Sequence, residues 1–136
     1  MPTATVKWVH HQKFLATVPS GHAFAMDNDH TPNSAAGSME ILLAALGTCT
    51  ATDLVIILEK KRQKLESLEI EISGERAEDP PRVWTKLEVL YRLRGTLDEK
   101  AVRDTIELSE TKYCSVAAML KKTAEITYRY EILPPE

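Results

Sequence analysis

The sequence predicts an α+β fold in a single domain, residues 1–136. Segments in which apolar and polar side chains alternate are typical of strands, and they occur on both sides of one long apolar stretch of helical length. No segment is repeated, and strands and helices do not alternate regularly along the chain. A chain of 136 residues is long enough for one hydrophobic core. We therefore expect the element order βββ-α-ββ-αα-β.

The first third of the chain predicts a small antiparallel meander. Residues 4–9, 14–18 and 22–26 each read as a short strand, and in the first and the third the side chains fall alternately on two faces. Residues 10–12 and 19–21 separate these strands, and the second of these segments, Pro-Ser-Gly, is rich in turn-forming residues.

The stretch Ser38–Arg62 predicts one long helix with a buried middle. Ile41–Thr52 is uncharged and lies between Glu40 and Asp53. A helix that is apolar on every side is buried, whereas a membrane span needs about 20 apolar residues. We interpret the stretch as a core helix rather than a membrane anchor, with Ser38 as its N-cap and Glu40 in its first turn.

The rest of the chain predicts two further strands, a helical segment and a last strand. Thr96 and Glu99 have the spacing of a capping box, which predicts a helix start there. The expected elements are strands at residues 68–73, 83–94 and 126–132, a helix at residues 97–112, and a second short helix that opens at residues 113–115 and closes at residues 121–122. The two strands at 68–73 and 83–94 should pair antiparallel across the turn Asp79–Arg82.

Charge and composition argue against nucleic acid and membrane partners. The net charge is −3, and the only basic run ends the long helix, so there is no electrostatic footprint for nucleic acid. Residues 1–20 contain no unbroken apolar segment and no cleavage-like site. We expect a cytoplasmic protein.

The two cysteines are the candidate reactive groups. Cys49 and Cys114 are 65 residues apart, so neither forms part of a CxxC motif. Cys114 is expected at a helix start, where free backbone N–H groups favour the thiolate and make it the more acidic thiol. Cys49 lies inside an apolar helix with Asp53 one turn on, which disfavours its thiolate unless a cation approaches. Either cysteine can instead be an inert core residue.

No cofactor or metal is expected. The four histidines have no spacing that resembles a metal site. A zinc site built from Cys49, Cys114 and one histidine remains an alternative that no specific pattern supports.

Two motifs resemble a known family. The block SMEILLAALGTCTATDLV and the later KYCSVAAMLKK closely resemble the OsmC/Ohr family of osmotically inducible and organic hydroperoxide resistance proteins, and PPRVWTKLEVLYRLRG resembles that family's strand pair. The resemblance implies an OsmC-like fold in an intertwined homodimer, with a sheet shared between the subunits and the two long helices at its centre.

The resemblance also implies a thiol peroxidase. Cys49 would attack an organic hydroperoxide and become a sulfenic acid, Cys114 would resolve it to a disulfide, and a dithiol would reduce that disulfide. Glu40 would be the acidic residue of the site. This order reverses the expectation from position alone, which makes Cys114 the more reactive thiol.

The sequence departs from the family's pattern at two points. The family's hydroperoxide reductases have a glutamate ten residues before the helical cysteine, whereas here Met39 is at that position and Glu40 is at nine. Those enzymes also use an arginine from the N-terminal strands, and no arginine precedes Arg62 here; Lys7 and Lys13 are the early cations. The alternative function is therefore a non-catalytic ligand-binding or redox-sensing dimer.

Overall fold

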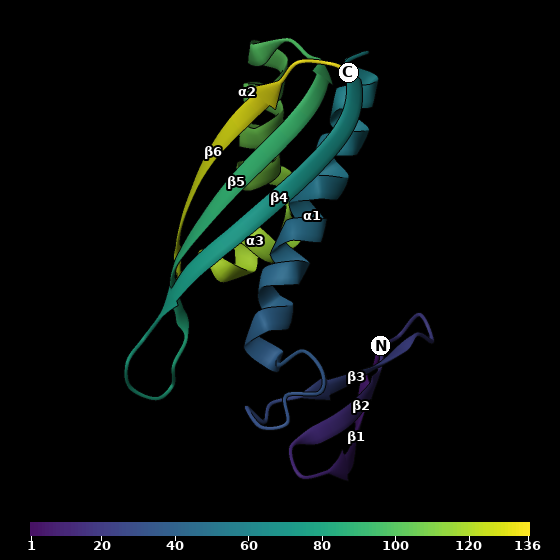
Figure 1. The fold of residues 1–136 in the computed structure, drawn as a ribbon, viewed down its shortest axis with the longest axis vertical. Helices are drawn as coiled ribbons and strands as arrows, with labels where there is room; N and C mark the ends of the chain where they lie inside the picture. Colours follow the sequence, from purple (N-terminus) through teal and green to yellow (C-terminus); the bar gives the residue numbers. More distant parts are fainter. The chain divides into compact units, whose positions relative to one another are not determined.

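The computed structural model describes all 136 residues of the chain. Strands β1 to β6 and helices α1 to α3 follow the predicted order, with a π-helical segment, η1, between α2 and α3 (Figure 1). The chain forms two compact units, Met1–Leu42 and Leu43–Glu136. The predicted α+β class and the element order are confirmed.

The N-terminal unit contains the predicted meander. Strands β1 (Thr5–His10), β2 (Lys13–Thr17) and β3 (Ala23–Asp27) form a sheet in the order β1-β2-β3, and both pairs are antiparallel. His11 has a φ of 50°, so the turn between β1 and β2 is closed by a residue in the left-handed region.

The start of helix α1 (Ser38–Lys60) differs from the prediction. The carbonyl of Gly37 accepts the first helical hydrogen bond, from the Ile41 amide at 3.1 Å, so Ser38 is the first helical residue and not the N-cap. The Gly37 amide donates to Oε2 of Glu40 at 2.9 Å. Glu40 thus satisfies an amide that would otherwise lack a partner, which is one half of a capping box.

The C-terminal unit is built on a second three-stranded sheet. Strand β4 (Lys64–Arg76) pairs antiparallel with β5 (Trp84–Thr96), as predicted, and β5 pairs parallel with β6 (Glu125–Leu133). These long strands lie side by side in Figure 1. A parallel neighbour requires a crossover connection, and the chain between β5 and β6 supplies it.

The crossover differs in detail from the predicted helix pair. Its segments are α2 (Glu99–Leu108), η1 (Ser109–Tyr113) and α3 (Ser115–Leu120). Asp98 is the N-cap of α2, because its Oδ2 accepts from the Ala101 amide at 3.0 Å. Thr96, the expected cap, is instead the last residue of β5. The predicted single helix thus ends at Leu108 and continues as a wider π-helical turn.

The helices of this unit cover one face of the sheet (Figure 1). The buried core between them consists of side chains from α1, β5, α2 and α3 and from the segments that follow η1 and α3: Leu46, Leu54, Leu58, Leu87, Val89, Tyr91, Leu93, Val102, Ile106, Cys114, Ala117 and Ala124. Most are aliphatic, and Tyr91 and Cys114 are the members with a polar atom. The core therefore contains a thiol and a phenol.

Helix α1 is buried along one stripe and not all round, contrary to the prediction. The buried residues recur every fourth position, at Leu46, Thr50, Leu54 and Leu58. Val55 and Ile56, on another side, are 48% and 46% exposed. A single sheet covers only one side of a helix, so the other apolar side lacks a partner within the chain. The helix also meets the length and composition criteria of a membrane span, as core helices of soluble proteins can.

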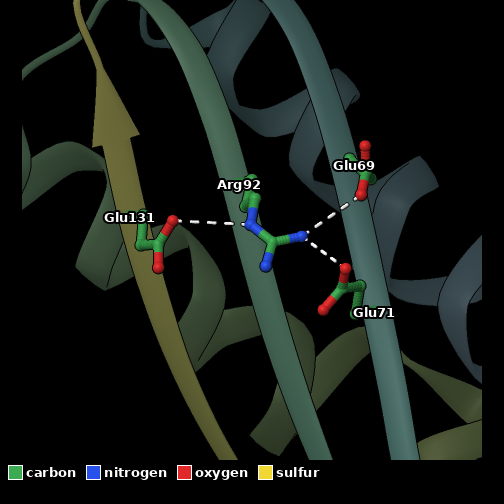
Figure 2. A network of polar contacts seen from close by, with 4 residues as sticks. All are labelled: Glu69, Glu71, Arg92 and Glu131. Atoms are coloured by element: carbon green, nitrogen blue, oxygen red, sulfur yellow. Dashed lines mark hydrogen bonds and ion pairs between the residues drawn. The ribbon is translucent and has the colours of Figure 1, made fainter.

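An ion-pair network lies on the opposite face of the sheet. Arg92 of β5 donates to Glu71 at 2.5 Å and to Glu69 at 3.2 Å, and its Nε lies 3.4 Å from Glu131 (Figure 2). The guanidinium therefore links all three strands. Its hydrogen bond to Glu71 is the main reason that the pKa of that carboxyl lies below its ordinary value.

Replacing Arg92 by Gln is expected to lower the stability of the protein in a salt-dependent way. Three carboxylates would lose their counter-charge, but exposed pairs are screened, so the loss should be small and should shrink in high salt. The pKa of Glu71 is lowered by folding, so its contribution is present at neutral pH and is lost as the pH falls below about 4. Thermal unfolding of both proteins at pH 7 and pH 3 measures this, and an equal difference at both pH values would contradict it.

Candidate active site

Cys49 lies on α1 next to the buried stripe. Its side chain is half-buried and packs against the hydrophobic core of the C-terminal unit. Gly47, two residues earlier, allows a close approach, since a Cβ there would lie 2.8 Å from the Cδ1 of Ile72. The helix therefore sits against β4 near the turn that carries Cys49.

Cys114 joins η1 to α3 and is buried. Its backbone is extended, at φ −74° and ψ 104°, and its sulfur accepts a hydrogen bond from the Ala117 amide at 3.3 Å. The thiol is therefore the N-cap of the short helix α3, as its predicted position at a helix start requires. Cys114 is only 3% exposed.

The fold brings the two thiols together. Cys49 packs against the core cluster that contains Cys114, and it lies near enough to raise the pKa of the Cys114 thiol, although the residues are 65 positions apart in the sequence. Both cysteines are free. A disulfide requires Cβ atoms about 3.5–4.5 Å apart, so the two thiols are candidates for such a bond.

Cys114 is not the acidic thiol that its position predicted. Burial, the neighbouring Cys49 side chain and, least, the charge of Glu110 raise the pKa of the Cys114 thiol to about 12, and the Ala117 amide opposes them only in part. Of these effects on the pKa of Cys114, the cap interaction was the one that the sequence indicated. Desolvation outweighs it because the thiolate would lie inside the core.

A buried chain of hydrogen bonds lies beside the thiols. Thr50 donates to the Tyr91 hydroxyl at 3.1 Å, and that hydroxyl donates to Oε1 of Glu110 at 2.5 Å. Tyr91 and Thr50 are fully buried and Glu110 is 5% exposed. Burial raises the pKa of Glu110, while Tyr91 and Lys121 oppose the shift. Burial and the Glu110 charge also raise the pKa of the Tyr91 phenol.

Glu110 and Tyr91 were not among the residues selected from the sequence. The strand alternation places Tyr91 on the buried face, and a buried Tyr hydroxyl requires a partner, so a signal for one polar neighbour existed. Glu110 had none, because a glutamate is almost never fully buried unless it is paired and the sequence did not show its pairing with Tyr91. Here η1 buries both Ser109 and Glu110.

Asp53 is tied to the same turn. Ser109 donates to its Oδ2 at 2.9 Å. The Asp53 carboxylate, one turn after Cys49, is thus bonded to η1 through the Ser109 hydroxyl group.

The other predicted participants lie elsewhere or have other contacts. Glu40 is exposed, belongs to the N-terminal unit and bonds the Gly37 amide, so its catalytic role stays a prediction. Arg82, a cation in the turn between β4 and β5, donates to the Ala77 carbonyl at 3.2 Å. No group of three or more His, Cys, Asp or Glu side chains in the chain is arranged to hold a metal ion.

Comparison with known proteins gives the family. A family model described as OsmC-like protein matches residues 31–129. Protein YhfA of Escherichia coli strain K12 is 40% identical over 131 residues, 96% of this chain and 97% of that protein.

Two solved structures extend the comparison. A hypothetical protein from Aquifex aeolicus VF5 is 29% identical with a TM-score of 0.91, covering 100% of this chain and 98% of that one. The organic hydroperoxide resistance protein OhrB of Bacillus subtilis is 10% identical with a TM-score of 0.65, covering 96% and 98%, so it shares the fold alone. The chain belongs to the OsmC-like protein family.

Proposed function

We propose that this protein is a dithiol-dependent peroxidase that reduces organic hydroperoxides. The observation that carries the proposal is the proximity of two free thiols at an apolar core, with Cys114 in the core and Cys49 packed against it. Two neighbouring free thiols can be oxidised to a disulfide and reduced again, which is the cycle that a thiol peroxidase uses. The apolar surroundings suit a lipid-like or aryl hydroperoxide rather than a small polar one.

The proposed cycle has three balanced steps. The Cys49 thiolate attacks the outer oxygen of the hydroperoxide, the O–O bond breaks, and the alkoxide leaves as an alcohol after taking a proton. Cys114 then attacks the sulfur of the Cys49 sulfenic acid, the S–S bond forms and water leaves. A dithiol reduces the disulfide by two exchange steps and becomes a cyclic or protein disulfide itself. No metal or organic cofactor takes part.

We propose that the active form is a homodimer in the cytoplasm. The uncovered apolar side of α1, with Val55 and Ile56 about half exposed, supports a second copy of the chain as its cover, because a large exposed apolar patch usually marks an interface. Exposed Val6 and Trp8 on β1 support a shared sheet in the same way. A reducing compartment also suits a protein whose cysteines must be free to react.

A direct assay tests the proposed function. The purified protein is expected to consume cumene hydroperoxide in the presence of dithiothreitol, and to do so far more slowly with an equal thiol concentration of a monothiol, which cannot cyclise. Product alcohol should form in equal amount to the peroxide lost. Consumption no faster than in the protein-free mixture would overturn the proposal.

The second candidate is a ligand-binding or redox-sensing dimer without turnover. It is supported by the lack of any arginine before Arg62, because a lysine supplies charge without the bidentate geometry of a guanidinium. A Cys49 that does not react with iodoacetamide at neutral pH would favour this alternative, whereas rapid alkylation would favour the peroxidase.

A further inference from the structure

The hydrogen-bonded chain Thr50–Tyr91–Glu110 connects the two turns that carry the thiols. Thr50 directly follows Cys49 on α1, and Glu110 lies four residues before Cys114 on η1. Tyr91 reaches between them from β5 and bonds both. None of these three side chains forms or breaks a bond in the proposed cycle, so the chain needs another explanation.

Glu110 is the member of this chain whose burial is energetically least favourable. A carboxyl group that is 5% exposed has lost most of its hydration, which is unfavourable unless other groups compensate. Its oxygen is the final acceptor of the chain, since Thr50 donates to Tyr91 and Tyr91 donates to Glu110; this direction suits the ionised form. Lys121 donates to the Glu110 main-chain carbonyl at 2.7 Å and adds a positive charge nearby.

A negative charge in this pocket acts on the neighbouring thiol. Interactions between charges are much stronger in a poorly hydrated core than in water. Glu110 is the second residue of η1 and Cys114 directly follows η1; both side chains are buried, and the charge of Glu110 is among the causes that raise the pKa of the Cys114 thiol. A carboxylate at this place therefore opposes ionisation of Cys114.

We propose that Glu110, held by Tyr91, is a positioning residue that helps to set which thiol meets the peroxide first. Its carboxylate adds to burial, the larger effect, in keeping Cys114 in the thiol form, so that Cys49 is the thiol that is oxidised directly. This inference rests on the proposed peroxidase function and adds to it the source of the order between the two cysteines. It also explains why the reaction order is the reverse of the one that helix position alone predicts.

The thiol form of Cys114 does not block the second step. Peroxide reacts with thiolates, so a protonated Cys114 survives the first step. When its sulfur attacks the Cys49 sulfenic acid, the S–O bond breaks, the S–S bond forms, and the Cys114 proton leaves with the hydroxyl group as water. No separate base is consumed.

Other charged or titratable groups lie near Glu110 and Cys114, and each is present in both proteins when a Glu110 variant is compared with the parent. Lys121 carries the opposite sign, Asp53 is bonded by Ser109, and Tyr128 of β6 has a raised pKa from burial and from the charges of Glu107 and Glu110. A Glu110→Gln substitution removes only the Glu110 charge and keeps an oxygen that can accept from Tyr91. A difference in the modification rate of Cys114 between the variant and the parent thus measures the effect of that one charge.

The test measures initial rates of modification of each cysteine by a small thiol reagent, methyl methanethiosulfonate, between pH 5 and pH 9, with peptide mass spectrometry to separate the two sites. At pH 9, Cys114 should react about tenfold faster in Glu110→Gln than in the parent, the change expected for one pKa unit. The ratio of the Cys114 rate in Glu110→Gln to that in the parent should fall towards one as the pH falls through the raised pKa of Glu110, because the carboxyl is then neutral in the parent as well. A merely structural effect would open the site at every pH and would accelerate Cys49 alike.

Two further variants keep the test decisive. Glu107→Gln removes an equal charge from an exposed position on α2 and should leave the Cys114 rate unchanged. Tyr91→Phe removes the donor to Glu110, so the pKa of Glu110 rises further; between the Glu110 pKa values of the parent and the variant, Cys114 should react faster, and this variant serves if Glu110→Gln does not fold. An unchanged or slower Cys114 rate in folded Glu110→Gln or, in its place, in folded Tyr91→Phe over that pH interval would overturn the inference. Because no peroxide is used, this result is independent of whether the protein is a peroxidase.

Discussion

Cys49→Ser is expected to abolish all protein-dependent reduction of cumene hydroperoxide. A serine hydroxyl is not ionised at neutral pH and cannot form a sulfenic acid, so the first step of the cycle is lost. Cys49 is half-buried, and the substitution replaces one atom, so the fold should persist. Peroxide consumption with dithiothreitol measures the effect, and circular dichroism checks the fold.

Cys114→Ser is the matched control for the first prediction, because it removes the partner thiol and leaves Cys49 in place. Without reductant, this variant should consume one equivalent of peroxide and hold Cys49 as a sulfenic acid that dimedone traps. The parent should give no dimedone adduct, because its disulfide closes first. If Cys49→Ser reduced peroxide as fast as the parent, the roles assigned to the two cysteines would be wrong.

Gly95→Ala is expected to give the largest loss of stability. Gly95 lies near the end of β5 with a φ of 148°, and an added Cβ would collide with the Lys64 carbonyl on β4. Both the conformation and the clash involve backbone, so neither is relieved by a side-chain rotation. The expected loss in unfolding free energy is about 3 kcal/mol or more, measured by urea unfolding.

Gly21→Ala separates the two contributions in that prediction. Gly21 also has a positive φ, 91°, but a Cβ there meets no atom within 4 Å. This variant should lose only about 1 kcal/mol, the cost of the backbone conformation alone. Equal losses in the two variants would show that the contact with Lys64 has no energetic importance.

Most of the fold was predictable from the sequence because its signals are local. Alternation revealed most of the strands, and turn residues separated them, so the order and the antiparallel pair β4–β5 were correct. The limits of β4 were too short because pairing continues across register shifts at Leu65/Ser67 and Glu75/Arg76, where alternation is interrupted. Helix caps were wrong where backbone context decides, with Gly37 and Asp98 taking the places assigned to Ser38 and Thr96.

The site was predictable only in part, because its defining properties are not local. The identity of the two cysteines followed from their motifs, but burial reversed the acidity expected for Cys114. Glu110 became visible only through the π-helical turn, which depends on the packing of α2 and η1. The uncovered side of α1 likewise could not be read from composition, since an all-apolar helix does not reveal how many partners cover it.

Disulfide mapping tests the central claim, the functional pairing of Cys49 with Cys114, most directly. Unlabelled and ¹⁵N-labelled protein are mixed, treated with one equivalent of cumene hydroperoxide, alkylated and digested without reduction. The predicted result is one crosslinked peptide pair, Cys49 to Cys114, with both halves carrying the same label, because the bond forms within a chain. Recovery of Cys114 as a free alkylated thiol beside an unmodified or sulfinic Cys49 would contradict the account.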